Sequence, residues 1–276
     1  MKKYCYLNGK VMPLEKAKID PYDLGVLRGY CVFDVMCTEN GKPFLLDDHW
    51  KRLQNSAKEL NLTIPVKKED YEKILKDLLT RNGFKKSTIR TVLTGGISSD
   101  AFSPEKKETF FILIEKFHEY EKELYEKGIK LITVEHSRFL PRAKIASYIM
   151  ALKNYDNRVK NGAFEILYVE DGNVLEASTS NIFLVKNGKL ITPKEKILFG
   201  ITRNLVIKLA KSAKIKVEER EIKTSELTNA DEIFIAATNK EIMPVVKVDN
   251  QKIKNEKVGE MTKELMEKFE EFAVKY

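Results

Sequence analysis

Strand-like and helical segments follow one another along this chain without a strict strand–helix repeat, and this order restricts the fold more than any other feature. Alternating residues around Asn8-Gly9 predict a β-hairpin at 1–12. Alternating or β-branched runs predict strands at 31–38, 88–94, 109–115, 129–135, 215–220 and 232–237. Apolar residues at helical spacing predict helices at 68–81, 145–160, 202–213 and 257–273, and another that follows an N-cap at Asp47 and Asp48. Gly83 is expected to end the helix at 68–81. Runs of strands broken by helices are typical of an α+β fold.

A highly charged stretch divides the chain into two parts of globular size. The sequence predicts an N-terminal small α/β domain at 1–116, an interdomain linker at 117–127 and a C-terminal large domain at 128–276. A length of 276 residues suits one large domain or two medium ones, and an apolar content of 43% is enough for a buried core.

Composition and charge exclude several classes of protein. No apolar run is long enough for a transmembrane helix, and none follows the N-terminal lysines as in a signal peptide. The net charge of +8 could indicate a nucleic-acid partner, but the lysines are interleaved with glutamates and not with exposed aromatic residues. Three cysteines and three histidines lack the spacing of a metal site, and such scattered cysteines fit a reducing cytoplasm. We therefore expect a cytoplasmic protein that binds neither metal, membrane nor nucleic acid.

Four local features are candidates for chemistry. Lys144 is placed where a loop is expected to enter an apolar helix, although most lysines in so lysine-rich a chain lie on the surface. Glu176 follows a strand and precedes a run of small polar residues, which is more typical of a site loop than of a surface turn. Residues 200–203 precede a helix and could bind an anion or simply cap that helix. Residues 236–241 end a strand with small side chains, which allow a ligand to approach closely.

Together with several motifs, these features resemble the fold-type IV pyridoxal-phosphate (PLP) enzymes. That family includes branched-chain aminotransferases, D-amino acid aminotransferases and aminodeoxychorismate lyases. The matching segments occur in order along the chain, at 25–34, 40–44, 49–57, 144, 175–183, 188–193, 200–203 and 237–245. The resemblance implies two α/β domains with the active site between them, PLP as cofactor, and a homodimer.

The resemblance also implies roles for individual residues. Lys144 is the catalytic lysine, which binds the cofactor aldehyde and later moves a proton. Glu176 keeps the pyridine nitrogen protonated, and Tyr148, on the same helical face as Lys144, bonds the ring hydroxyl. The other cofactor-binding residues that it implies are Arg52, Ser180, Asn181, Ile201, Thr202 and Thr238.

Two arginines bear on the substrate. Arg28 and Arg90 could form a clamp for the substrate carboxylate, although Arg90 could equally belong to a structural ion pair. The remaining substrate-binding candidates are Phe33, Thr238 and Asn239. Residues 95–100 contain neither the arginines typical of the lyases nor the arginine and histidine typical of D-amino acid aminotransferases.

The clamp slightly favours an aminotransferase for D-amino acids, with 2-oxo acids as the second substrate. The alternative is a branched-chain L-amino acid aminotransferase that uses 2-oxoglutarate. An aminodeoxychorismate lyase or an (R)-amine transaminase matches the residues less well. A non-catalytic PLP-binding protein is a further hypothesis, and the presence of both Lys144 and Glu176 argues against it.

Overall fold

The computed structural model describes residues 3–276, and the chain divides into two compact units. The first unit contains the described residues up to His118, together with Ala143–Ser147 and Tyr276. The second unit contains Glu119–Arg142 and Tyr148–Lys275. Most of the expected linker at 117–127 belongs to the second unit, where it forms helix α4 (Lys122–Lys127).

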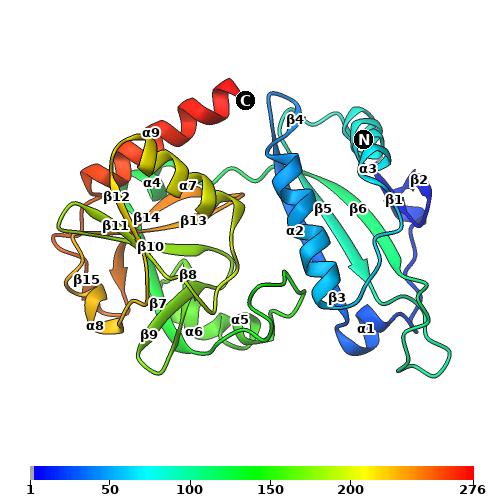
Figure 1. Ribbon diagram of the computed structural model, residues 1–276, viewed down its shortest axis with the longest axis horizontal. Helices are drawn as coiled ribbons and strands as arrows, with labels where there is room; N and C mark the ends of the chain where they lie inside the picture. Colours follow the sequence, from blue (N-terminus) through cyan, green and yellow to red (C-terminus); the bar gives the residue numbers. More distant parts are fainter. Residues whose placement is uncertain (1–2) are drawn as a thin grey trace. The chain divides into compact units, whose positions relative to one another are not determined.

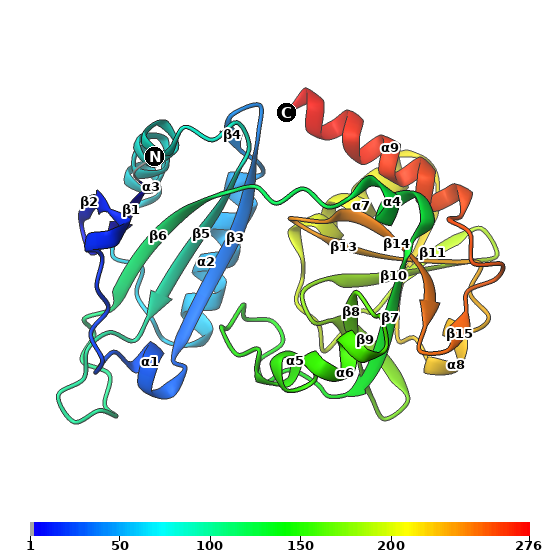
Figure 2. The ribbon, with the colours of Figure 1, turned by 180° about the vertical axis from the view of Figure 1, so that it is seen from behind.

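The first unit is a six-stranded antiparallel sheet covered on one face by two helices (Figures 1 and 2). Its strands, in the order β2-β1-β6-β5-β3-β4, are β2 (Lys10–Pro13), β1 (Tyr4–Leu7), β6 (Thr109–Lys116), β5 (Ser87–Thr94), β3 (Cys31–Glu39) and β4 (Lys42–Pro43). Helices α2 (Leu46–Glu59) and α3 (Lys68–Asn82) bury Leu53 and Leu75 against the sheet. The shorter helical segments are η1 (Leu14–Lys16) and α1 (Leu24–Arg28).

The turns of the first unit largely follow the sequence signals. Asn8 and Gly9 adopt φ of 43° and 89° and join β1 to β2, which confirms the predicted hairpin; only its residues 1 and 2 lie outside the described part of the chain. Gly83 ends α3 in the left-handed conformation, as expected. The predicted N-cap at Asp47 and Asp48 is wrong, because α2 begins at Leu46 with Leu45 as its N-cap and places both carboxylates in its first turn.

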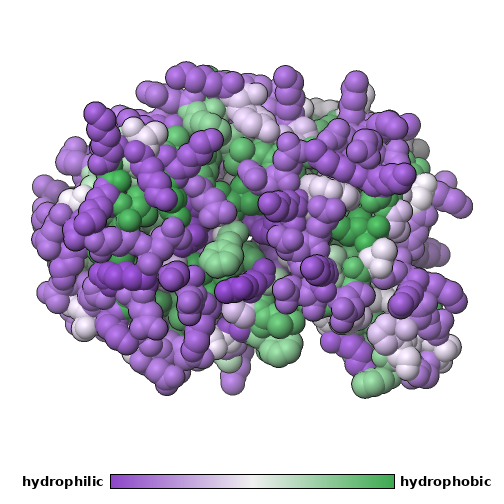
Figure 3. Space-filling model, in the orientation of Figure 1, coloured by the Kyte–Doolittle hydropathy of each residue, from purple (hydrophilic) through white to green (hydrophobic). Residues whose placement is uncertain are grey.

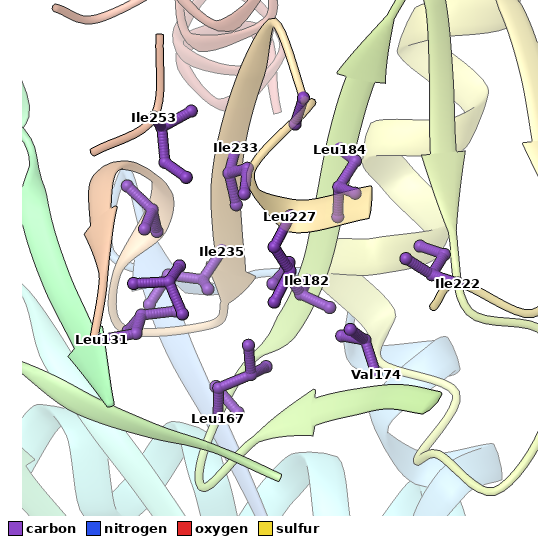
Figure 4. Close-up of a cluster of buried hydrophobic side chains, with 14 of the residues drawn as sticks. Leu131, Leu167, Val174, Ile182, Leu184, Ile222, Leu227, Ile233, Ile235 and Ile253 are labelled. Atoms are coloured by element: carbon purple, nitrogen blue, oxygen red, sulfur yellow. The ribbon is translucent and has the colours of Figure 1, made fainter. Parts of the chain in front are cut away.

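The second unit has a nine-stranded mixed sheet. Its strands are β12 (Lys216–Glu219), β11 (Lys189–Thr192), β10 (Asn181–Lys186), β13 (Glu232–Ala237), β14 (Glu241–Val248), β7 (Ile129–Glu135), β8 (Glu165–Glu170) and β9 (Asn173–Ala177) in spatial order, with β15 (Gln251–Lys252) beside β14. Helices α7 (Ile201–Ser212) and α9 (Glu260–Lys275) pack against β13 and β14. Aliphatic side chains of several strands meet in one core, among them Leu167, Ile182 and Ile235 (Figure 4).

One predicted helix is largely wrong. Residues 145–160 were expected to form a single helix, but the structure has two short ones, α5 (Ile149–Lys153) and α6 (Tyr155–Lys160). Residues 143–147 are instead extended along β3, since Phe33 N–H donates to the Lys144 carbonyl and Ala146 N–H to the Cys31 carbonyl. These backbone bonds to a neighbouring strand replace those that a helix would make.

Hydrophilic residues dominate the face shown in Figure 3, with separate apolar areas between them. The remaining helix of the second unit is α8 (Thr224–Leu227). Within residues 3–276, no helix is both long enough and apolar enough to cross a bilayer.

Candidate active site

Lys144 lies in the extended segment that the first unit holds beside β3. Its backbone N–H donates to the Ser56 hydroxyl of α2 at 3.0 Å, and its carbonyl accepts from Phe33 of β3. Its ammonium nitrogen is 4.5 Å from the centre of the Phe33 ring, which is a cation–π contact. Both backbone groups are therefore fixed, while the half-buried side chain lies against an aromatic face.

The buried face of α2 carries three polar residues beside β3. His49, Arg52 and Ser56 occupy positions i, i+3 and i+7, which share one side of a helix. Arg52 donates from Nε and Nη2 to the two carboxylate oxygens of Asp34, at 2.7 and 3.0 Å. His49 Nδ1 lies 2.6 Å from Asp34 Oδ1. This two-point contact fixes the plane of the Arg52 guanidinium.

Burial and charge act in opposite directions on this cluster. Burial would raise the pKa of Asp34, but the charges of Arg52 and His49 hold it well below its ordinary value. For His49, burial lowers the pKa. The charge and hydrogen bond of Asp34 act in the opposite direction, but they do not raise the pKa back to its ordinary value. At neutral pH, Asp34 is therefore ionised and His49 is neutral.

The two arginines expected to form a carboxylate clamp lie in different settings. Arg90 of β5 donates to Glu115 of β6 at 3.3 Å, which is the structural ion pair considered as its alternative. By strand register, Arg90 shares a sheet face with Phe33, opposite to α2 and α3. Arg28 is exposed at the end of α1, and its guanidinium donates to the Leu27 carbonyl.

In the second unit, Glu176 is the centre of a buried polar cluster. Arg138 Nε lies 3.1 Å from Glu176 Oε1, and the side chains are 10% and 4% exposed. The other carboxylate oxygen accepts from the Leu198 N–H at 3.2 Å and from the Asn181 amide at 3.4 Å. Burial opposes the charge of Arg138, but Glu176, Tyr148 and Tyr168 together outweigh it and raise the pKa of that guanidinium. Arg138 is therefore charged at neutral pH, and it faces the Glu176 carboxylate.

The Asn181 side chain connects this cluster to the start of α7. Its amide donates to the Leu198 carbonyl at 2.8 Å, and a Cβ built on Gly200 would approach its Oδ1 within 2.1 Å. Gly200 is the N-cap of α7, and the buried residues Ile201 and Thr202 form the first turn. N–H groups in a first helical turn have no intrahelical acceptor and favour anions.

The remaining candidates for contacts with cofactor and substrate also belong to the second unit. Tyr148 is the N-cap of α5, so it does not share a helical face with Lys144; its ring instead stacks with the Arg138 guanidinium at 5.3 Å. The Ser180 hydroxyl donates to Glu165 and is thus engaged in the protein interior. Thr238 and Asn239 are half-buried in the turn between β13 and β14.

Sequence reasoning did not identify several members of these clusters. Asp34 and Ser56 belong to the segments 25–34 and 49–57, but no role was assigned to them, because only tertiary contacts reveal their partners. His49 and Arg138 had weak signals in the sequence. His49 belongs to the segment 49–57. Arg138 is one of only nine arginines among the 49 basic residues of the chain.

Comparison with known proteins identifies the family. The family model for amino-transferase class IV matches residues 31–248, well over half of the chain. The chain belongs to the class IV aminotransferases. This aminotransferase is 37% identical over 98% of its length to a putative branched-chain-amino-acid aminotransferase of Methanocaldococcus jannaschii, 96% of which is covered. It is 30% identical over 97% of its length to D-alanine aminotransferase of Staphylococcus aureus (strain N315), of which 96% is covered.

A solved structure gives the same family. The aminotransferase superimposes on a T.th. branched-chain amino acid aminotransferase with pyridoxamine 5'-phosphate at a TM-score of 0.92, with 28% identity, over 100% of this chain and 95% of that one. The fold class is α+β of fold type IV, as the motifs predicted. The chain is a PLP-dependent transaminase that acts on amino acids and oxo acids.

The residues present fit PLP chemically. The first unit offers a lysine amine and an arginine fork, and the second offers a buried carboxylate and the N-terminus of a helix of 12 residues. A side chain at position 200 would collide with Asn181, so glycine at this position lets the Asn181 side chain lie against the start of α7. These groups match an aldehyde, a phosphate and a pyridine nitrogen.

Proposed function

We propose that this aminotransferase moves the amino group of a branched-chain L-amino acid to 2-oxoglutarate. The observation that carries the proposal is the 37% identity, over nearly the whole chain, to a putative branched-chain aminotransferase, against 30% to a D-alanine aminotransferase. The branched-chain hypothesis thus has better support than the preference for D-amino acids expected from Arg28 and Arg90.

The surroundings of Arg90 also favour the branched-chain substrate. The Arg90 guanidinium already has a carboxylate partner in Glu115, so a substrate carboxylate would have to compete with that ion pair. In the loop at 98–103, Asp100 accepts from Ser98 and from Ser103, so the loop is organised by its own side chains. The loop has neither of the basic residues that the D-amino acid enzymes place there.

For the cofactor, we propose that Arg52, Ile201, Thr202 and Thr238 bind the phosphate. Arg52 would use the edge of its fork that Asp34 leaves available, and the first turn of α7 would contribute N–H groups. Tyr148 and Asn181 would orient the ring, the second by holding the loop before Gly200. Ser180, whose hydroxyl donates to Glu165, would contribute by holding the loop beside the ring.

Two residues would carry the chemistry. Bound PLP supplies an aldehyde for the amino group and a ring that withdraws electrons from the substrate α-carbon. Lys144 would move the proton from that α-carbon to the former aldehyde carbon of the cofactor, and would reverse this transfer when the 2-oxo acid is converted. Glu176, paired with Arg138, would hold a proton at the pyridine nitrogen.

A half-reaction panel tests the substrate. The purified holoenzyme is mixed with single L- or D-amino acids, and the conversion of PLP to pyridoxamine phosphate is followed by chromatography. We expect L-leucine, L-isoleucine and L-valine to react and D-alanine to react poorly. Reaction of D-alanine and D-glutamate alone would contradict the proposal and favour the second candidate, which the similarity to D-alanine aminotransferases supports.

We further propose that the protein is a cytoplasmic homodimer, as the resemblance implies. Sedimentation equilibrium of the holoenzyme should give about twice the chain mass of 31.9 kDa. An active monomer would contradict this assembly.

A further inference from the structure

A buried ion pair lies beside the turn that carries Thr238. Lys240 Nζ is 3.3 Å from Glu165 Oε2, and the side chains are only 6% and 5% exposed. Lys240 ends the turn between β13 and β14, whereas Glu165 begins β8, so the pair joins distant parts of the second unit. Charges so deeply buried are costly unless both partners are paired and hydrogen-bonded.

The same two charges hold the loop that follows Glu176. Lys240 Nζ donates to the Thr179 hydroxyl at 2.6 Å and to the Ser180 hydroxyl at 3.2 Å. Glu165 accepts from the backbone N–H of Thr179 and from the hydroxyls of Ser178, Thr179 and Ser180. Each of the three residues between Ala177 and Asn181 is thus bonded to Glu165, and two of them also to Lys240.

The turn itself has further anchors. The Lys240 carbonyl accepts from the Tyr125 hydroxyl at 3.2 Å, and the Asn239 amide donates to the Tyr120 hydroxyl at 3.2 Å. The Lys240 N–H donates to the Ala237 carbonyl, which closes the turn around Thr238. Backbone, side chain and neighbouring tyrosines therefore all restrict the position of residues 238–240.

We propose that Lys240 is a positioning residue, which uses its ion pair with Glu165 to fix the Thr238 turn and the loop after Glu176 relative to each other. A flexible lysine fits this role because its three donors reach Glu165, Thr179 and Ser180 together. The inference rests on the proposed contact of Thr238 with the phosphate. It adds that the phosphate-binding turn and the loop beside the pyridine-binding carboxylate act as one rigid piece.

The test compares cofactors with and without a phosphate. Apoprotein of wild type, Lys240→Met, Thr238→Ala and the pair Lys240→Met with Glu165→Gln is titrated with PLP and with pyridoxal. Glu232→Gln is the matched control, because Glu232 lies at the other end of β13 and accepts from the first turn of α9. Amide hydrogen exchange of residues 177–181 and 237–241 is measured on the same apoproteins.

We expect Lys240→Met to weaken PLP binding by about tenfold and pyridoxal binding by less than about twofold. Exchange should become faster in both segments. The paired variant removes both buried charges, so it should fold even where Lys240→Met does not, and it should show the same selective loss. Glu232→Gln should lower the melting temperature without changing the ratio of the two affinities.

Several outcomes would overturn the inference. One is a lower melting temperature for Lys240→Met with the wild-type ratio of affinities, which would make the ion pair merely structural. Another is faster exchange in only one of the two segments. If Thr238→Ala leaves the ratio unchanged, the proposed phosphate contact fails, and the exchange data alone decide whether Lys240 connects the segments. The half-reaction of wild type with L-leucine tests the proposed function separately.

Discussion

At the scale of single residues, Lys144 has backbone partners that do not depend on its amine. Phe33 and Ser56 hold the segment through main-chain bonds, so a change of side chain leaves these bonds in place. Chemistry and folding are thereby separated at this position, which makes Lys144 suitable for mutation.

Lys144→Ala should abolish transamination while the protein keeps its fold and binds PLP non-covalently. The reason is that the proposed phosphate contacts belong to other residues, whereas the covalent link and the proton transfer need the amine. Borohydride reduction followed by peptide mass spectrometry measures the link. Lys153→Ala, in the exposed part of α5, is the matched control and should react as wild type. A reducible link at another lysine in Lys144→Ala would contradict the assignment.

Asp34 orients Arg52, and its removal should affect the phosphate selectively. Asp34→Asn loses the ionic two-point contact, so the guanidinium is free to rotate. The affinity of the apoprotein for PLP should fall about tenfold, while that for pyridoxal changes little. Asp77→Asn, which breaks an exposed ion pair with Arg81 on α3, serves as the control. An equal loss for both cofactors would mean that Asp34 stabilises the fold only.

At the scale of elements, the position of the α7 N-terminus depends on a residue without a side chain. Gly200 touches the Asn181 amide, and that amide also contacts Glu176 and the Leu198 carbonyl. The Asn181 side chain therefore connects the start of α7 with Glu176.

Gly200→Ala should displace Asn181 or the first turn of α7, because the added Cβ would approach Asn181 Oδ1 within 2.1 Å. We expect PLP affinity to fall by about tenfold or more, with a smaller loss for pyridoxal. Equilibrium titration of the apoprotein measures both. Lys208→Ala, on the exposed side of the same helix, should leave both affinities unchanged. Wild-type affinity in Gly200→Ala would exclude the helix start from the site.

At the scale of the whole molecule, the buried cluster of α2 links stability to pH. Burial lowers the pKa of His49 below its ordinary 6.5, so the unfolded chain binds its proton at a higher pH than the folded chain does. The contribution of neutral His49 to the free energy of unfolding is therefore fully present above pH 6.5, and it is lost as the pH falls from that value toward the pKa of His49 in the folded chain. The lowered pKa of Asp34 adds a further loss at more acidic pH.

Urea unfolding at pH 7.5, 6.5 and 5.5 should accordingly show decreasing stability of the wild type. His49→Gln should be less stable at pH 7.5 but should lose less stability on acidification, because it has no proton to bind at this site. His136→Gln is the comparison, since burial also lowers the pKa of His136 to some extent. An identical decrease in wild type and His49→Gln would show that other groups cause the acid sensitivity.

The sequence by itself determined the class of the fold, most of the elements and the family. Turn residues such as Asn8-Gly9 and Gly83 act locally, so they indicated the hairpin and the end of α3 correctly. The motifs around Lys144, Glu176 and Gly200 identified a class IV aminotransferase. The chemistry needs particular residue types, and the motifs that contain them follow one another along the chain in the order typical of the family.

Only the tertiary structure decided which partners these residues have. The helical spacing of 145–160 predicted one helix, but hydrogen bonds to β3 keep Lys144 extended, since a neighbouring strand outweighs weak local propensity. The partner of Arg90 proved to be Glu115, 25 residues away in sequence, and Lys240 pairs with Glu165 at a still greater separation. Ion pairs between distant segments depend on how strands are ordered in a sheet, and local patterns contain no information about that order.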